Sequence, residues 1–270
     1  MDTLNHLLDA LSLSAIKSCY AEVAEQAGRE GLDYAAFLTE LLTREYEERE
    51  TERITRRLRE SRLPLEKSFA NLECARFPRR LRERIALIQT GEFMTRRENI
   101  LVFGTPGAGK THLLCALGQE LIRKGYRVYF RSCALLIQEL LKAKRDLTLP
   151  RLLQRLGRYD TLVLDDLGYV KYTREEMEVF FTLLADRYER SSILLTSNQP
   201  FSKWESIFLD PMTAAAAIDR LIHHSIIVEM NLPSYRVEEA RNRQKESEEM
   251  SPGEDVGESQ VSSVSQDVTA

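Results

Sequence analysis

Apolar side chains recur at helical spacing through the first part of the chain. Residues 1–62 contain no proline and alternate apolar with charged positions, which predicts a small all-helical unit. Ser14 is predicted to cap one helix, which Gly31 ends, and Asp33 is predicted to cap a second, longer helix. A Leu-Pro pair then interrupts the pattern, because proline disfavours helix at the residue before it. We therefore expect an N-terminal helical domain over residues 1–65.

The hydrophobic period changes in the middle of the chain, where short apolar runs alternate with longer amphipathic segments. Five runs predict strands, at residues 100–103, 127–130, 162–164, 193–196 and 226–228. Alternation of strands and helices predicts an α/β fold in which helices cover both faces of a parallel sheet. Thr173 followed by Glu176 predicts a capping box for a helix that ends near Arg190. These elements define a predicted domain over residues 66–240.

The last zone, residues 241–270, is rich in Ser, Glu, Gly and Gln and has no aromatic residue, which predicts an acidic disordered tail. Seven acids and no Lys or Arg follow residue 245, so the overall net charge of -4 becomes +3 for residues 1–245. Residues 53–97 contain twelve Arg, one Lys and five Glu, which give a local net charge of +8. A polyanionic partner is therefore expected.

Composition places the chain among globular proteins: 43% of its 270 residues are hydrophobic and 30% are charged. The segment 1–20 has acids where a secretion signal has basic residues, and no apolar run approaches about 18 residues. The four cysteines form no CxxC pair. These features favour a cytoplasmic protein with reduced thiols and no membrane association.

Residues 104–111 match the phosphate-binding pattern GxxxxGK[ST] at every required position. A predicted strand precedes this loop and a predicted helix follows it, which is the context the pattern needs. Glycines let backbone N–H groups line a concave loop, and the helix N-terminus adds partial positive charge. Lys110 is expected to reach the β and γ phosphates of a nucleotide, and the Thr111 hydroxyl to hold Mg²⁺. The predicted nucleotide-binding residues are Gly104, Thr105, Pro106, Gly107, Ala108, Gly109, Lys110, Thr111 and His112.

Two further predicted strands end in polar residues. Asp165 is the expected second metal ligand, because an apolar strand that ends in a carboxylate delivers negative charge to the cation. Asp166 is expected to orient, or to take a proton from, the water that attacks the γ phosphate. Asn198 can hold that water if its strand lies between the other two. Each ending alone is also typical of a turn, and their order after a P-loop favours the nucleotide site.

Taken together, the segments GTPGAGKTHL, LVLDDLG, LLTSNQPFSKW, IDRLIHH and SYR resemble the IstB-like ATP-binding family, the helper ATPases of insertion sequences, which are related to the DnaC helicase loader. The resemblance covers about residues 50–236. It implies an AAA+ P-loop ATPase core, ATP and Mg²⁺ as ligands, homo-oligomers on duplex DNA, and a transposase partner encoded by the same element.

The resemblance also implies roles for single residues. Residues 104–111 resemble the Walker A loop, and Asp165 and Asp166 the Walker B acids. By position, Asn198 resembles the first sensor, Arg220 the arginine finger supplied to a neighbouring subunit, and Arg236 a second sensor. The predicted catalytic residues are therefore Lys110, Asp166, Asn198, Arg220 and Arg236. The chain departs from the broad AAA+ pattern in having Asp166 where a Glu is usual.

Three other functions remain open from the sequence: a DnaC-like helicase loader, a small-molecule P-loop kinase, and a nucleotide-dependent interaction protein that barely hydrolyses ATP. Arg220 and the basic segment fit assembly on DNA better than kinase chemistry. The residues predicted to contact DNA are Arg56, Arg57, Arg59, Arg79, Arg80, Arg82 and Arg84. Other singled-out residues are given structural roles: Trp204 as a loop anchor, Cys115 as a packed side chain, and His223 and His224 as non-ligands.

Overall fold

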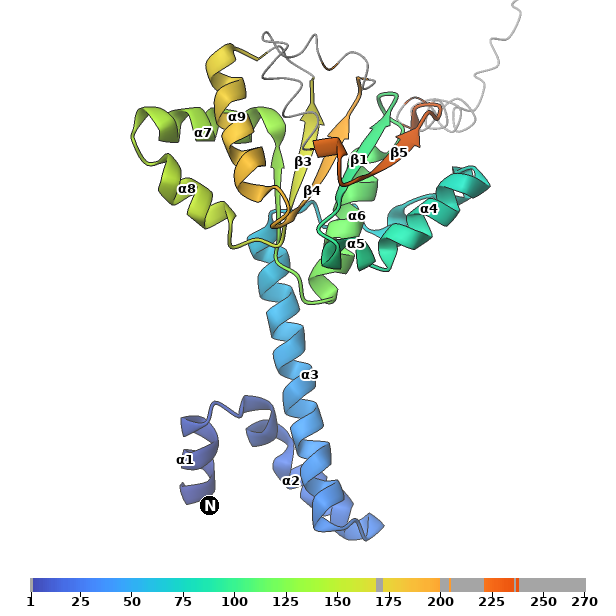
Figure 1. The fold of residues 1–270 in the computed structure, drawn as a ribbon. Coiled ribbons are helices and arrows are strands. Elements are labelled where there is room, and N and C mark those ends of the chain that lie inside the picture. Colours follow the sequence, from blue (N-terminus) through green and yellow to red (C-terminus); the bar gives the residue numbers. More distant parts are fainter. Residues whose placement is uncertain (1, 169–171, 200–203, 205–220, 236, 238–270) are drawn as a thin grey trace, which may run out of the picture.

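The computed structural model describes residues 2–168, 172–199, 204, 221–235 and 237. An α/β core contains the sheet, and one long helix leads away from it to two shorter N-terminal helices (Figure 1). The predicted fold class, a parallel sheet flanked by helices with helices before it, is confirmed.

Three helices form the N-terminal part: α1 (Asp2–Ala10), α2 (Ser14–Glu30) and α3 (Tyr34–Ser61). A small apolar cluster holds them together, and its buried members are Leu8, Ile16, Val23 and Leu41. The predicted cap of α3 is confirmed, since the Asp33 carboxylate accepts a hydrogen bond from the Ala36 N–H at 2.7 Å. Gly31 ends α2 in a left-handed conformation, as expected.

The prediction that Ser14 caps α2 is wrong. Ser14 is the first residue of the helix, and no side chain of the preceding residue caps it. The carboxylate of Glu45, from α3, instead accepts the Ala15 N–H at 2.9 Å and the Ile16 N–H at 3.2 Å. Helix N-termini need acceptors for their first N–H groups, and a carboxylate also complements the helix dipole. A side chain from α3 therefore fulfils the role that the sequence assigned to a local serine.

Helix α3 connects the N-terminal helices to the core. Its 28 residues span about 42 Å at 1.5 Å per residue. Near its C-terminal end, Ile54 and Leu58 pack against the core, and the Arg57 guanidinium donates a hydrogen bond to the carbonyl oxygen of Gly125. The helix ends just before the Leu-Pro pair, as predicted, and the chain continues through two short 3-10 helices, η1 (Phe69–Asn71) and η2 (Cys74–Arg76). The domain boundary at residue 65 stays a prediction.

Five parallel strands make up the sheet, in the order β2-β3-β4-β1-β5. They are β1 (Asn99–Gly104), β2 (Val128–Ser132), β3 (Thr161–Leu167), β4 (Ser192–Ser197) and β5 (Ser225–Met230). Each coincides with one of the predicted strands. Because β4 lies between β3 and β1, the condition set above for Asn198 is met.

Helices cover both faces of the sheet (Figure 1). On one face lie α4 (Arg79–Gln89), α5 (Glu92–Thr95) and α6 (Lys110–Arg123), and on the other α7 (Cys133–Arg145), α8 (Leu149–Leu156) and α9 (Arg174–Arg187). Neighbouring residues of β1 enter opposite layers: Ile100 packs with α6, and Leu101 packs on the side of α7 and α9. Burial on both faces explains why the strands are continuous apolar runs.

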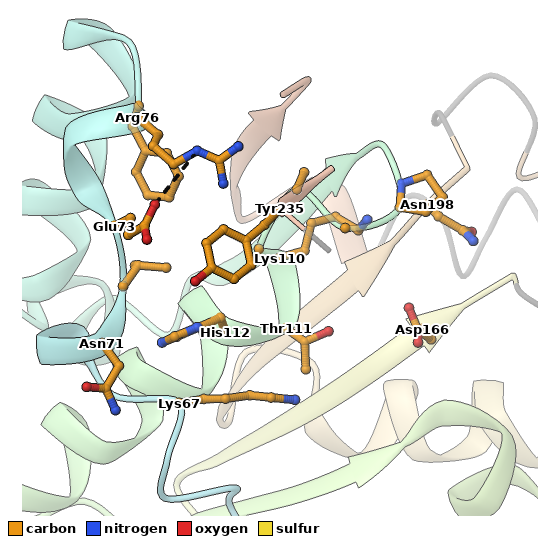
Figure 2. A pocket seen from close by; sticks show the side chains of 16 residues that line it. Lys67, Asn71, Glu73, Arg76, Lys110, Thr111, His112, Asp166, Asn198 and Tyr235 are labelled. Carbon is orange, nitrogen blue, oxygen red and sulfur yellow. Dashed lines mark ion pairs between the residues drawn. The ribbon is translucent and has the colours of Figure 1, made fainter. Parts of the chain in front are cut away.

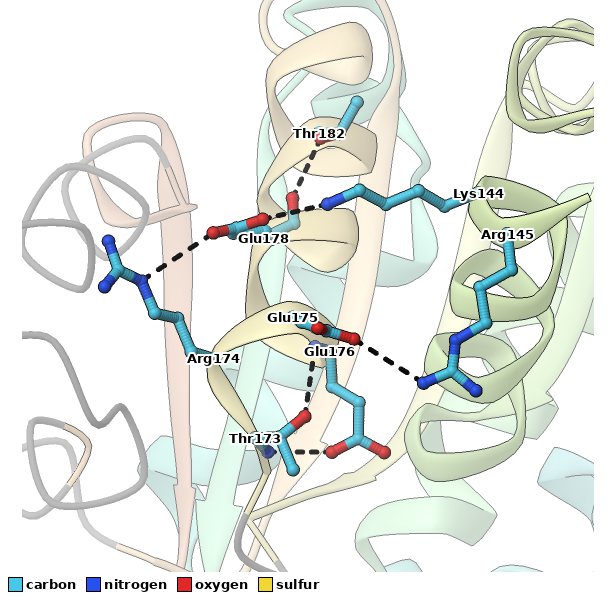
Figure 3. A network of polar contacts seen from close by, with 8 residues as sticks. All are labelled: Lys144, Arg145, Thr173, Arg174, Glu175, Glu176, Glu178 and Thr182. Atoms are coloured by element: carbon cyan, nitrogen blue, oxygen red, sulfur yellow. Dashed lines mark hydrogen bonds and ion pairs between the residues drawn. The ribbon is translucent and has the colours of Figure 1, made fainter. Parts of the chain in front are cut away.

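Ion pairs join α9 to α7 across the exposed surface (Figure 3). The Lys144 ammonium lies 2.9 Å from a Glu178 oxygen, and the Arg145 guanidinium 3.5 Å from a Glu175 oxygen. The predicted capping box of α9 is also confirmed, because Thr173 and Glu176 exchange hydrogen bonds. The helix ends at Arg187, three residues before the predicted end. Among the described residues, no helix is both long and apolar enough to cross a membrane.

Candidate nucleotide-binding site

The loop between β1 and α6 forms one wall of a cavity of about 450 Å³ at the carboxyl ends of the strands. Residues 106–112 line it, so the N-terminus of α6 opens directly on the cavity. Gly107 of this loop is required by close packing as well as by conformation. A Cβ atom added at Gly107, whose φ is +80°, would lie 2.1 Å from the Ser234 hydroxyl oxygen. The geometry is that of a loop that binds phosphate through its backbone.

Lys110 lies inside this loop with only 6% of its surface exposed. Its ammonium donates hydrogen bonds of 2.9 Å to the carbonyl oxygens of Gly104 and Thr105. The side chain is thus held at the loop, and Figure 2 shows it beside Thr111 at the centre of the cavity wall. A fixed positive charge here is the feature that polyphosphate binding requires.

Thr111 and Asp165 are brought together as the sequence predicted. The Thr111 hydroxyl donates to the Asp165 carboxylate at 2.8 Å, although the two residues belong to different elements, α6 and β3. Hydroxyl and carboxylate oxygens are the ligands that Mg²⁺ prefers. The donor set therefore fits a magnesium ion.

Asp166 and Asn198 line the side of the cavity opposite the segment between α3 and α4 (Figure 2). Asp166 has a φ of +60°, a left-handed conformation that is uncommon for residues other than glycine. The side-chain oxygen of Asn198 is buried without a hydrogen-bond partner among the described residues. An unsatisfied polar atom at a cavity wall needs a partner from beyond the described residues. A water molecule, which can donate a hydrogen bond to this oxygen, would supply it.

The remaining wall comes from residues that the sequence analysis did not assign to the site. Lys67, Asn71 and Arg76 reach the cavity from the linker between α3 and α4, and Tyr235 reaches it from the segment after β5 (Figure 2). The Tyr235 N–H donates to the Gly107 carbonyl oxygen at 3.0 Å, and the Arg76 guanidinium lies 5.2 Å from the Tyr235 ring centre. No local motif marks the three linker residues, because only the path of the linker along α6 brings them to the loop. Tyr235 lies within the SYR segment, but the sequence analysis assigned a role there to Arg236 alone.

His112 has a structural contact as well as a place in the cavity wall, since its Nε2 lies 2.8 Å from the Ser68 carbonyl oxygen. Trp204 is fully buried, and its ring centre lies 5.4 Å from that of Phe103, as expected for an anchor. The described residues include no group of three or more potential metal ligands, and both His223 and His224 contact side chains next to α9. Arg220 and Arg236 lie outside the described residues.

The thiols give a simple test of this packing. Burial raises the pKa of the Cys115 thiol to about 12 and that of Cys133 well above its ordinary value. A raised pKa leaves less thiolate at neutral pH, and thiolate is the reactive form. In the native protein at pH 8 we expect iodoacetamide to modify the half-buried Cys19 and Cys74 and to spare Cys115 and Cys133. Peptide mass spectrometry measures this, and denatured protein, in which all four should react, is the control.

A P-loop after the first strand, acids near the carboxyl end of the third and an amide after the fourth define a nucleotide-binding protein with the AAA+ P-loop fold on this sheet order. The family described as "IstB-like ATP binding protein" matches residues 6–243. The chain belongs to this family.

Relatives agree with this assignment. The chain is 42% identical to an insertion sequence ATP-binding protein of Sinorhizobium fredii, over 86% of this chain and 78% of that protein. It is 38% identical to the IS21 ATP-binding protein of Pseudomonas aeruginosa, over 89% of this chain and 91% of that protein. Among solved structures, AMPPCP-bound DnaA from Aquifex aeolicus shares the fold, with a TM-score of 0.54 and 24% identity over 68% of this chain and 56% of that one.

Proposed function

We propose that this protein hydrolyses ATP, assembles on duplex DNA and regulates the transposase encoded by the same insertion sequence. The observation that carries the proposal is the cavity that joins the P-loop, Asp166 and Asn198, with Asp165 bonded to Thr111 of its wall, on a chain related to insertion sequence ATP-binding proteins. Those relatives are named for insertion sequences, which favours the transposition role over a helicase loader. A transposase reading frame immediately upstream would support it further, whereas binding to a replicative helicase would favour the loader.

For hydrolysis, each residue supplies one part of the chemistry. Lys110 places a positive charge against the transferred phosphoryl group, and Thr111 and Asp165 would hold Mg²⁺. The metal, when bound, neutralises charge on the phosphates. Asp166 orients the attacking water or accepts its proton, and Asn198 holds that water through its side-chain oxygen, which has no partner among the residues the structure describes.

Oligomers would complete the site. A transferring phosphoryl group needs positive charge on its outer oxygens. In the proposal, Arg220 supplies that charge to the neighbouring subunit and Arg236 acts as the second sensor. ATP would then link subunits as well as provide energy.

The proposed DNA surface is α4. Arg79, Arg80, Arg82 and Arg84 are all exposed on this helix, and the ion pair of Arg79 with Glu83 is itself exposed. On α3, Arg56 and Arg59 are exposed, whereas Arg57 is bonded to the core. Exposed arginines on one helix bind phosphates without reading bases. We therefore expect DNA binding to be nearly independent of sequence.

Removal of the α4 arginines tests this surface. The variant with Arg79, Arg80, Arg82 and Arg84 changed to Ala should bind duplex DNA more weakly in the presence of ATP. The slope of log affinity against log salt should fall in magnitude by about 2 to 4, because each phosphate contact contributes about 0.9. Fluorescence anisotropy at several salt concentrations measures both quantities.

A matched control removes four exposed arginines from the other side of the sheet: Arg145, Arg151, Arg155 and Arg158. This control changes the net charge by the same amount as the α4 variant. It should keep more of the parent protein's DNA affinity and salt slope than the α4 variant does. Equal losses in the two variants would show a general charge effect, and an unchanged slope in the folded α4 variant would exclude α4 from the DNA surface.

A further inference from the structure

Thr196 is a fully buried residue of β4 that contacts both acids of the site through one side-chain atom. Its hydroxyl lies 2.7 Å from the Asp165 Oδ1 and 2.8 Å from the Asp166 backbone nitrogen. It lies on the strand between β3 and β1, two residues before Asn198. Nothing in its local sequence distinguishes it from an ordinary strand threonine.

The position of Thr196 follows from an irregularity in β3. The ladder pairs Leu164 with Leu195 and then Leu167 with Ser197, so both Asp165 and Asp166 face the single residue Thr196. This is a β-bulge, which leaves an extra residue outside the regular ladder. The left-handed conformation of Asp166 belongs to the same irregularity. The Asp166 N–H finds its acceptor in the Thr196 side chain instead of a strand carbonyl group.

Hydrogen-bond chemistry determines how the hydroxyl is oriented. A backbone N–H can only donate, so the Thr196 oxygen must accept from Asp166. The single hydroxyl proton is then directed to Asp165 Oδ1, which also receives the Thr111 hydroxyl. One buried atom therefore sets the direction of the proposed metal ligand and supports the bulge that carries the proposed water-orienting acid. Bonds to a carboxylate are stronger than neutral ones, and burial strengthens them.

We propose that Thr196 is a positioning residue for the two acids, and that its hydroxyl is required for Mg²⁺-dependent nucleotide binding and for hydrolysis. The proposal rests on the ATPase function proposed above. It goes beyond packing, because a residue that only filled the core would not affect metal dependence. The neighbouring strand offers a matched comparison: Thr161 of β3 is also fully buried, and its hydroxyl donates to the Ser192 carbonyl oxygen at 3.0 Å, at the end of the sheet away from the site.

Three variants test the proposal: Thr196→Ala, Thr196→Ser and Thr161→Ala. Calorimetry compares ATP affinity with Mg²⁺ and with EDTA. The ratio of the ATP affinity with Mg²⁺ to that with EDTA should be about 10- to 100-fold smaller in Thr196→Ala than in the parent protein. This is the range expected for a lost hydrogen bond to a charged group. Thr196→Ser should retain that gain within about threefold, because it keeps the hydroxyl. Thr161→Ala should also retain the Mg²⁺-dependent gain in affinity, even if its thermal stability falls as much as that of Thr196→Ala.

A second measurement needs no nucleotide. Hydrogen exchange of the peptide that covers the end of β3 should become faster in Thr196→Ala, because the Asp166 N–H loses its acceptor. Thr196→Ser should exchange like the parent protein. The proposal would be overturned if Thr196→Ala left both the hydrogen exchange and the metal dependence unchanged. It would also be overturned if Thr196→Ser behaved like Thr196→Ala in these measurements. If the parent binds ATP without hydrolysing it, the ATPase proposal fails, and these two readouts still decide the role of Thr196.

Discussion

Replacement of Lys110 by alanine is expected to lower the affinity for ATP by about 100-fold. The ammonium is buried at the phosphate loop, and its removal leaves the charge of the β and γ phosphates uncompensated. Hydrogen bonds to charged groups contribute about 1.5 to 3 kcal/mol each, and about 1.4 kcal/mol corresponds to a tenfold change. Isothermal titration calorimetry with ATP and Mg²⁺ measures the change directly.

The control is Lys124→Ala, which removes the same charge from the exposed C-terminal end of α6. This variant should bind ATP like the parent protein. Circular dichroism establishes that both variants keep their helical content. Equal ATP affinity of folded Lys110→Ala and the parent would contradict the assignment of this loop as the phosphate site.

Asp166→Asn is expected to slow ATP hydrolysis by about 10²- to 10⁴-fold, the usual contribution of a general base. ATP affinity should change little, because Lys110, Thr111 and Asp165 are untouched. Asparagine is the suitable replacement, since it tolerates the left-handed conformation that Asp166 adopts. A phosphate-release assay at saturating ATP measures the rate.

Asp146→Asn serves as the matched control for this experiment. Asp146 is an exposed carboxylate at the C-terminal end of α7, outside the cavity lining, and its loss should leave turnover unchanged. Turnover of Asp166→Asn equal to that of the parent would move the water-orienting role to another residue. A loss of ATP affinity in parallel with turnover would instead indicate that Asp166 supports nucleotide binding.

Local signals in the sequence were sufficient for the strands, the phosphate loop and the Asp33 cap. Each depends on residues that are close together in the chain. A strand depends on a run of apolar residues, and the phosphate loop depends on eight consecutive positions. The cap depends on an acceptor that lies three residues before its donor. The order of the motifs also placed Asp165 correctly next to Thr111, because parallel strands bring their carboxyl ends to one edge of the sheet.

Long-range contacts decided the rest. Glu45 caps α2 from 29 or 30 residues away, and the Thr196 hydroxyl reaches Asp165 across 31 residues. The linker residue Arg76 enters the nucleotide cavity only because the chain returns along α6 after α3. A hydrogen-bonding side chain is compatible with many partners, and its partner is selected by which elements pack together. The sequence by itself therefore determined the phosphate loop and the acids of the site, whereas the packing of α3, the linker and the bulge in β3 determined which other groups meet them.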